Sequence, residues 1–158
     1  KKAFPNHVII VPSWGMSWGK GSPQYLNDVL KDASRRLGVP LTKPWLFPIS
    51  AAGPAGFRFY NASSKLFSGY VCIASCPSDK QARSLRGKLK VLMLNGAKDR
   101  RFPIDKVRER WGLLKPRLPA AARFQTIDAD HFFLLTHHAA AFKKIKAFMG
   151  KHGARQAD

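Results

Sequence analysis

A serine, an aspartate and a histidine occur in that order along the chain, each shortly after a segment with the composition of a buried strand. They are Ser50, Asp99 and His131. A serine hydroxyl is a weak nucleophile until a histidine accepts its proton, and the histidine needs a carboxylate that fixes its tautomer and stabilises its charged form. These three residues therefore predict acyl transfer through a serine nucleophile, if the fold brings them together.

Ser50 begins a turn of small residues, 50–53, between an apolar segment and a helical stretch. A sharp strand-to-helix turn would expose the serine oxygen and place the amide of Ala51 at a helix start, where it could donate to an oxyanion. Each residue also has a simpler interpretation. Ser50 could cap a helix, Asp99 could be a solvated turn acid, and His131 could be a structural histidine.

Two further acids, Asp128 and Asp130, compete with Asp99 for the carboxylate role. Asp130 directly precedes His131, so its carboxylate could turn onto that imidazole only with difficulty. Asp99 would arrive from the end of a neighbouring strand, and it is the acid we favour.

The elements that must position these residues alternate between strands and helices. We expect strands at 7–11, 45–49, 70–74, 90–94 and 123–127, and helices at 22–37, about 54–66, 78–85, 107–114 and 135–149. This alternation predicts an α/β fold, with a mostly parallel sheet, right-handed crossovers and helices on both faces in a three-layer α/β/α sandwich. In such a sheet, reactive groups collect at the carboxyl ends of the strands, which is where all three residues lie.

Three loops of the chain resemble those of the α/β-hydrolase superfamily. The turn 48–53 is similar to the nucleophile elbow, 94–99 to the acid loop and 130–133 to the histidine loop. The resemblance extends over nearly the whole chain and implies a triad of Ser50, Asp99 and His131. A narrower similarity is to esterases of the polyhydroxyalkanoate depolymerase and feruloyl esterase type.

The resemblance also implies how much of the fold the chain holds. The implied fold places the 7–11 strand just before the nucleophile strand, so the first strands of the complete sheet would be missing. We therefore expect residues 1–158 to form a single domain, the carboxyl-terminal larger part of an α/β-hydrolase. The second oxyanion donor would come from a loop before Lys1.

Two positions depart from the elbow pattern. The elbow usually has glycine two residues before and two residues after the serine, whereas this chain has Pro48 and Ala52. Proline adds a ring and removes an amide. Two functions therefore stay open: a serine hydrolase acting on carboxylic esters, and a catalytically inactive binding or scaffold protein whose basic surface binds anionic partners.

The charge of the chain favours anionic partners. Its 158 residues include 28 Lys and Arg against 9 Asp and Glu, a formal net charge of +19. The expected partner is a small-molecule ester, with anionic esters favoured by the charge. Nucleic acid or an anionic membrane surface is compatible with the charge, but no RNA-recognition, zinc-finger or helix-turn-helix pattern points to nucleic acid. The charge does not indicate the cellular compartment or the oligomeric state.

Several aromatic and sulfur-containing residues complete the set of expectations. Trp14, Trp18 and Phe132 are candidate walls of a substrate pocket. Cys72 and Cys76 are expected to be core residues, since two cysteines four apart on one strand cannot bridge each other. The serine chemistry needs no cofactor, and no cluster with metal-ligand spacing is present in the sequence.

Overall fold

The computed structural model describes residues 4, 7–11, 23–85 and 90–153, without the side chains of residues 23 and 151–153. The chain divides into two compact units, Lys1–Thr42 and Lys43–Asp158, and each is described by itself.

The first unit contains one helix, α1 (Pro23–Leu37), which confirms the helix predicted at 22–37. Gly38 follows it with a φ of +66°. A left-handed residue directly after a helix is the usual way to end it, and glycine adopts this conformation without a steric cost. On the surface of α1, Asp32 pairs with Arg35 and Arg36, one turn further along.

The buried strand predicted at 7–11 is wrong. These residues adopt no strand conformation, and their apolar side chains are exposed, Val11 to 83%. An apolar β-branched run becomes a strand only when a neighbouring strand satisfies its backbone groups. Within the described residues, none pairs with this segment.

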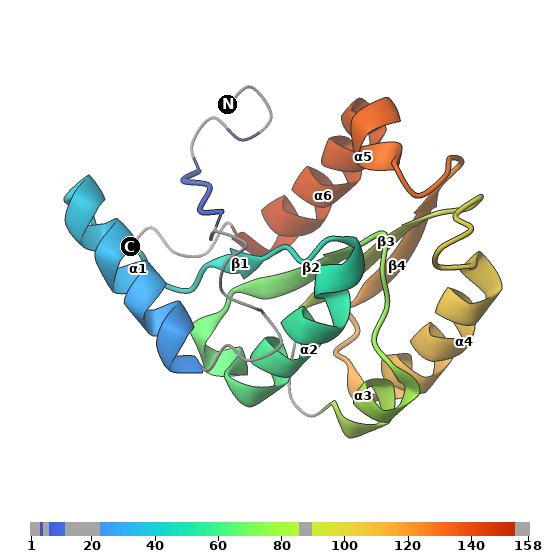
Figure 1. Cartoon of the computed structure of the whole chain (residues 1–158), viewed down its shortest axis with the longest axis horizontal. Helices are drawn as coiled ribbons and strands as arrows, with labels where there is room; N and C mark the ends of the chain where they lie inside the picture. The colour runs from blue at the N-terminus through green and yellow to red at the C-terminus, as the bar shows by residue number, and fades with distance from the viewer. Residues whose placement is uncertain (1–3, 5–6, 12–22, 86–89, 154–158) are drawn as a thin grey trace. The chain divides into compact units, whose positions relative to one another are not determined.

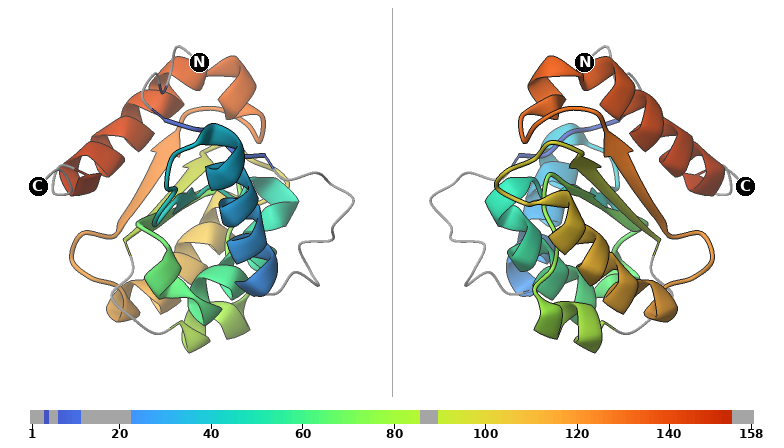
Figure 2. Two further views of the ribbon diagram at one scale, coloured as in Figure 1. Left: turned by 90° about the vertical axis from the view of Figure 1, so that its left-hand side faces the viewer. Right: turned by 90° about the vertical axis from the view of Figure 1, so that its right-hand side faces the viewer.

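The second unit is built on a parallel sheet whose four strands follow one another in chain order. They are β1 (Trp45–Leu46), β2 (Gly69–Ile73), β3 (Val91–Gly96) and β4 (Arg123–Ile127). Helices cover both faces, as Figures 1 and 2 show, with α2, α3 and α4 on one side and α5 and α6 on the other. The predicted three-layer α/β/α arrangement is confirmed in this unit.

The helices lie where the crossovers require them. Their bounds are η1 (Ser50–Ala52), α2 (Gly53–Ala62), η2 (Ser64–Leu66), α3 (Asp79–Ser84), α4 (Ile104–Leu114), η3 (Lys115–Arg117), α5 (Phe133–Thr136) and α6 (His138–Gly153). Ser78 caps α3, accepting from the amide of Gln81 while the Gln81 side chain accepts from the amide of Ser78.

The core lies on and around β2 and β3, whose residues are all buried. Tyr70 stacks on Tyr60, with ring centroids 5.0 Å apart, and packs against Phe57 at 4.5 Å. Cys72 and Cys76 are buried free thiols, as expected.

Several elements differ from their predicted extent. The helical stretch predicted at about 54–66 is divided into α2 and η2, and α4 begins three residues before the predicted 107–114. The strand predicted at 45–49 is assigned only over Trp45–Leu46, with one further bridge from Ile49 to Ile73. The strand lies at the edge of the described sheet, where only one of its sides is paired, and the side chains of Phe47 and Ile49 are exposed. Pro48, which has no amide to donate, is tolerated at such an edge. The single terminal helix predicted at 135–149 is divided at His137 into α5 and α6.

Candidate active site

Ser50 lies at the turn between the edge of the sheet and α2, and its backbone is left-handed, with a φ of +53°. A residue with a Cβ adopts this conformation at a cost of about 1 kcal/mol or more, so its surroundings must hold it. The Pro48 carbonyl accepts from the Ile73 amide at 3.0 Å. This bond attaches the residues just before the turn to strand β2.

A continuous chain of hydrogen bonds joins the serine, the histidine and the aspartate. Ser50 Oγ lies 2.8 Å from His131 Nε2, and His131 Nδ1 lies 2.8 Å from Asp99 Oδ2. An ionised carboxylate can only accept, so Nδ1 holds the proton and Nε2 is left to accept from the serine hydroxyl. The histidine side chain is 8% exposed and the aspartate side chain 0%, so this polar chain is largely shielded from water.

The second oxygen of Asp99 is bound by its own loop. Oδ1 accepts from the amides of Arg101 at 2.8 Å and Phe102 at 2.9 Å. The ring of Phe102 also stacks on the imidazole of His131, 5.9 Å away and within 12° of parallel. Phe102 is not among the site residues that the sequence predicts, because nothing in its spacing indicates that it would reach a histidine 29 positions later.

The acid loop and the histidine loop are fastened to each other through their backbones. The amides of Ala97 and Lys98 donate to the carbonyls of Ile127 and Ala129 at 2.7 and 2.9 Å. Gly96 is required here, because a Cβ at that position would overlap the backbone of the histidine loop. This fastening sets the distance between Asp99 and His131.

Neither competing acid contacts the imidazole. Asp128 pairs with Lys98 at 3.0 Å, and Asp130 Oδ1 accepts from the amide of Phe132 at 2.8 Å. Asp99 is the carboxylate that the fold brings to His131.

The two departures from the elbow pattern are accommodated by other glycines. A Cβ on Gly56 of α2 would come within 2.8 Å of the Pro48 ring, so glycine at this position makes room for that ring. A Cβ on Gly53 would overlap Ser75, which makes Gly53, and not Ala52, the point of close approach between helix and sheet. Ala52 itself has ordinary helical angles, with φ −74° and ψ −12°.

Ala51 follows the serine inside η1. The first amides of a helix have no acceptor within it, so the Ala51 N–H is of the kind that can stabilise a developing oxyanion.

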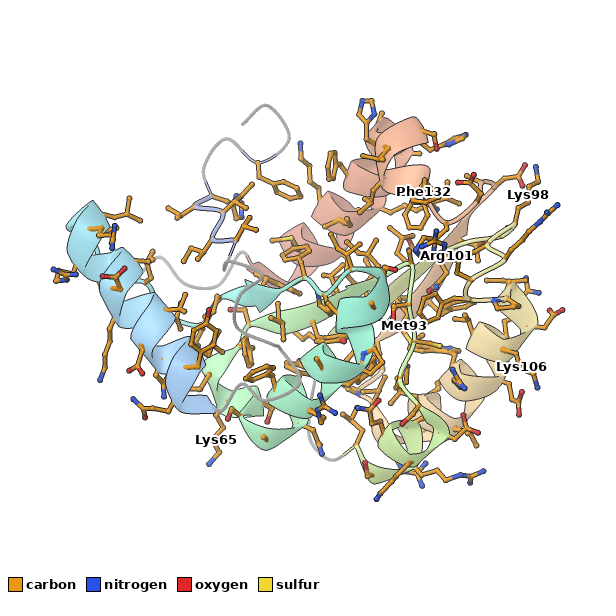
Figure 3. The ribbon with its side chains drawn as sticks, viewed as in Figure 1. Lys65, Met93, Lys98, Arg101, Lys106 and Phe132 are labelled. Carbon is orange, nitrogen blue, oxygen red and sulfur yellow. The ribbon has the colours of Figure 1, made fainter. Side chains whose placement is uncertain are left out.

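Phe132 lies beside the histidine on the exposed side of the site. Its ring is edge-on to the ring of His131 at 5.4 Å, and it is 48% exposed. The guanidinium of Arg101 lies over the same ring, 5.3 Å from its centroid, and Figure 3 shows these two side chains together. The other candidate pocket walls, Trp14 and Trp18, lie outside the described residues.

Two kinds of feature are absent from the described residues. No group of three or more His, Cys, Asp or Glu in this part of the chain could hold a metal ion. None of its helices combines the length and the apolar character needed to cross a bilayer.

Comparison with solved structures identifies the fold. A hydrolase from Thermoplasma acidophilum described as predicted and CIB-like superposes on 87% of this chain, with a TM-score of 0.62 and 15% identity. An esterase from Pyrococcus furiosus superposes on 89%, with a TM-score of 0.67 and 11% identity. An α/β-hydrolase enzyme from the metagenome of Mar Chica lagoon sediments superposes on 87%, with a TM-score of 0.62 and 16% identity. The chain therefore has the α/β-hydrolase fold.

The chain is shorter than these proteins. It spans 64%, 65% and 74% of their respective lengths. No protein-family model and no curated protein sequence matches it.

Proposed function

We propose that this chain is a serine hydrolase that acts on carboxylic esters. The observation that supports this most is the unbroken path from Ser50 Oγ through His131 to the buried Asp99, with 2.8 Å at both steps. The left-handed backbone of Ser50 adds to it, because strained serines at strand-to-helix turns are typical of nucleophiles in this fold. The esterases among the structures of similar fold are consistent with this chemistry.

The reaction would follow from the hydrogen bonds of the site. Ser50 Oγ attacks the ester carbonyl carbon while His131 Nε2 takes its proton, and the Ala51 amide donates to the carbonyl oxygen as it becomes negative. His131 then gives the proton to the departing alkoxide, which leaves an acyl group on Ser50. Water then gives a proton to the same nitrogen and adds to the acyl carbon. The bond from that carbon to Ser50 Oγ breaks, Oγ takes the proton back from His131, and the acid leaves. Asp99 keeps the proton on Nδ1 and stabilises the imidazolium formed in each half of the reaction.

Hydrolysis of 4-nitrophenyl butyrate tests the proposal. Ser50→Ala should lower kcat by about 10⁴-fold or more, since removal of the nucleophile leaves only the background rate of the site. The matched control is Ser84→Ala, which removes an exposed hydroxyl at the end of α3. Equal rates in wild type and Ser50→Ala would exclude Ser50 as the nucleophile.

The alternative is an inactive binding or scaffold protein, and the observation that favours it is proline at position 48. An inactive chain would fold normally and hydrolyse no ester, and it would bind an anionic polymer such as heparin or DNA with an affinity that falls steeply as salt is raised. Ester turnover that depends on Ser50 would count against it.

The narrower similarity to polyhydroxyalkanoate depolymerases and feruloyl esterases stays a prediction about the substrate. Comparing turnover of a 3-hydroxybutyrate oligomer with turnover of methyl ferulate would test it.

A further inference from the structure

Arg101 has an unusual position for a surface arginine. Its backbone amide donates to Asp99 Oδ1, so the start of its side chain is fixed relative to the acid of the site. Its guanidinium lies over the ring of Phe132, and that ring is edge-on to His131. Two successive ring contacts, with centroid distances of 5.3 and 5.4 Å, thus connect the cation to the imidazole.

This cation has no acidic partner within the described part of the chain. Each carboxylate there is already engaged with another group. Asp28 accepts from Gln24, Asp32 binds Arg35 and Arg36, Asp79 binds Arg110, Asp99 binds His131, Asp105 binds Arg108, Glu109 binds Lys106, Asp128 binds Lys98, and Asp130 accepts from the Phe132 amide.

The position of the Arg101 guanidinium over the Phe132 ring suits recognition of an anion. A guanidinium that lies on an aromatic face is held in orientation by the ring, and its N–H groups point outward in its own plane, where they can bind a carboxylate through two parallel hydrogen bonds. The ring also removes water from one face of the cation, which strengthens its attraction for an anion. Phe132 is half exposed, so a ligand can reach this pair from solvent.

We propose that Arg101, oriented by Phe132, binds a carboxylate of the substrate, so that the site prefers esters with a second, anionic group. This rests on the proposed ester hydrolysis and adds a substrate class to it. The positive charge of the whole chain would attract any anion, whereas the Phe132 contact assigns recognition to one residue. Arg100 is the matched control, because it has the same charge, is exposed, and is the adjacent residue of the same loop.

Two pairs of esters test the proposal, each differing in one charged group. Monomethyl glutarate and methyl glutaramate place the carboxylate or its neutral amide on the acyl side. 4-Acetoxybenzoate and 4-acetoxybenzamide place them on the alcohol side. The quantity measured is the ratio of kcat/KM for the anionic ester to that for the neutral one. The pair that shows a preference identifies whether Arg101 binds a carboxylate on the acyl or on the alcohol part of the ester.

In at least one pair the wild-type ratio should exceed the Arg101→Gln ratio by about five- to tenfold, the range between an exposed ion pair and a charged hydrogen bond. Arg101→Lys should restore part of the ratio, because lysine keeps the charge but cannot donate the two parallel hydrogen bonds of a guanidinium. Arg100→Gln should stay near wild type. Equal ratios in wild type and Arg101→Gln, or equal losses in the Arg100 and Arg101 variants, would overturn the proposal.

A binding measurement separates this proposal from ester hydrolysis itself. Absence of turnover for 4-nitrophenyl butyrate as well as for all four esters would contradict the proposed function. Calorimetric titration with monomethyl glutarate and 4-acetoxybenzoate would then decide the inference. The Ser50→Ala chain should bind one of them more tightly than the Ser50→Ala, Arg101→Gln chain does. Equal affinity in the two chains, or no binding of either ester, would overturn the role of Arg101.

Discussion

Asp99 uses both of its carboxylate oxygens, and each has a different task. Oδ2 accepts from His131, and Oδ1 accepts from two backbone amides. The positions of Ser50, Asp99 and His131, each after a different predicted strand, were enough to predict which residues meet, because parallel strands end at one edge. It could not predict Phe102, whose stacking on the imidazole depends on how the acid loop turns back.

This division predicts the effect of Asp99→Asn. The amide group has one oxygen and one NH₂, so either the two backbone amides or the Nδ1–H group would face a donor, and the histidine would lose its tautomer preference. We expect kcat for 4-nitrophenyl butyrate to fall about 10³- to 10⁴-fold, because a serine hydrolase whose histidine is held in the wrong tautomer loses about that much. Asp105→Asn, at a side chain 91% exposed on α4, is the control. A loss below about tenfold would mean that Asp99 does not orient the histidine.

At the scale of elements, the turn before α2 shows which local features a sequence pattern can predict and which it cannot. Small residues at 50–53 predicted a tight strand-to-helix turn, and the structure has one. The pattern suggested that Pro48 would disturb it and that Ala52 would be tolerated, but the close contacts fall on Gly53 and Gly56. Sequence spacing cannot reveal this, because it depends on which side of the helix faces the sheet. The prediction of a buried strand at 7–11 failed for a similar reason, since a strand is defined by the strand that pairs with it.

The space around two helical glycines differs, and this predicts opposite effects for their substitution by alanine. Gly53→Ala should lower the free energy of unfolding by about 2 to 3 kcal/mol, because the new methyl group would overlap Ser75 and force the helix away. Gly112→Ala, in α4, should raise it by about 0.5 to 1 kcal/mol, because its Cβ would meet open space and alanine favours a helix. Urea unfolding measures both. A stable Gly53→Ala chain would show that α2 does not pack this closely.

At the scale of the whole molecule, ionisable groups divide into a charged surface and an uncharged core. Six ion pairs between Lys or Arg and a carboxylate occur among the described residues, all on exposed or partly exposed side chains. The buried carboxylate in this part of the chain is that of Asp99, which is hydrogen-bonded to His131. In the core, burial raises the pKa of Tyr70 and of the Cys72 thiol well above their ordinary values. The alternation of strands and helices predicted this core, because continuous apolar strands are buried on both faces.

These raised pKa values predict that the fold weakens at alkaline pH. Above about pH 9 the unfolded chain releases protons from these groups while the folded chain retains them, so the free energy of unfolding falls as pH rises, by up to about 1.4 kcal/mol per pH unit for each group. Urea unfolding at a series of pH values measures the slope. Cys72→Ala should have a shallower slope than wild type, and this comparison separates the thiol from the titration of surface lysines. Identical slopes would contradict the prediction.

The claim that Ser50 is an activated nucleophile is tested most directly by a fluorophosphonate, which forms a covalent bond with a serine only when a base takes its proton. The wild-type chain should gain one phosphonyl group, and peptide mass spectrometry should locate it on Ser50. Ser50→Ala should gain none, and Ser84→Ala should react as wild type does. A folded wild-type chain that stays unmodified, or is modified at another serine, would contradict the account.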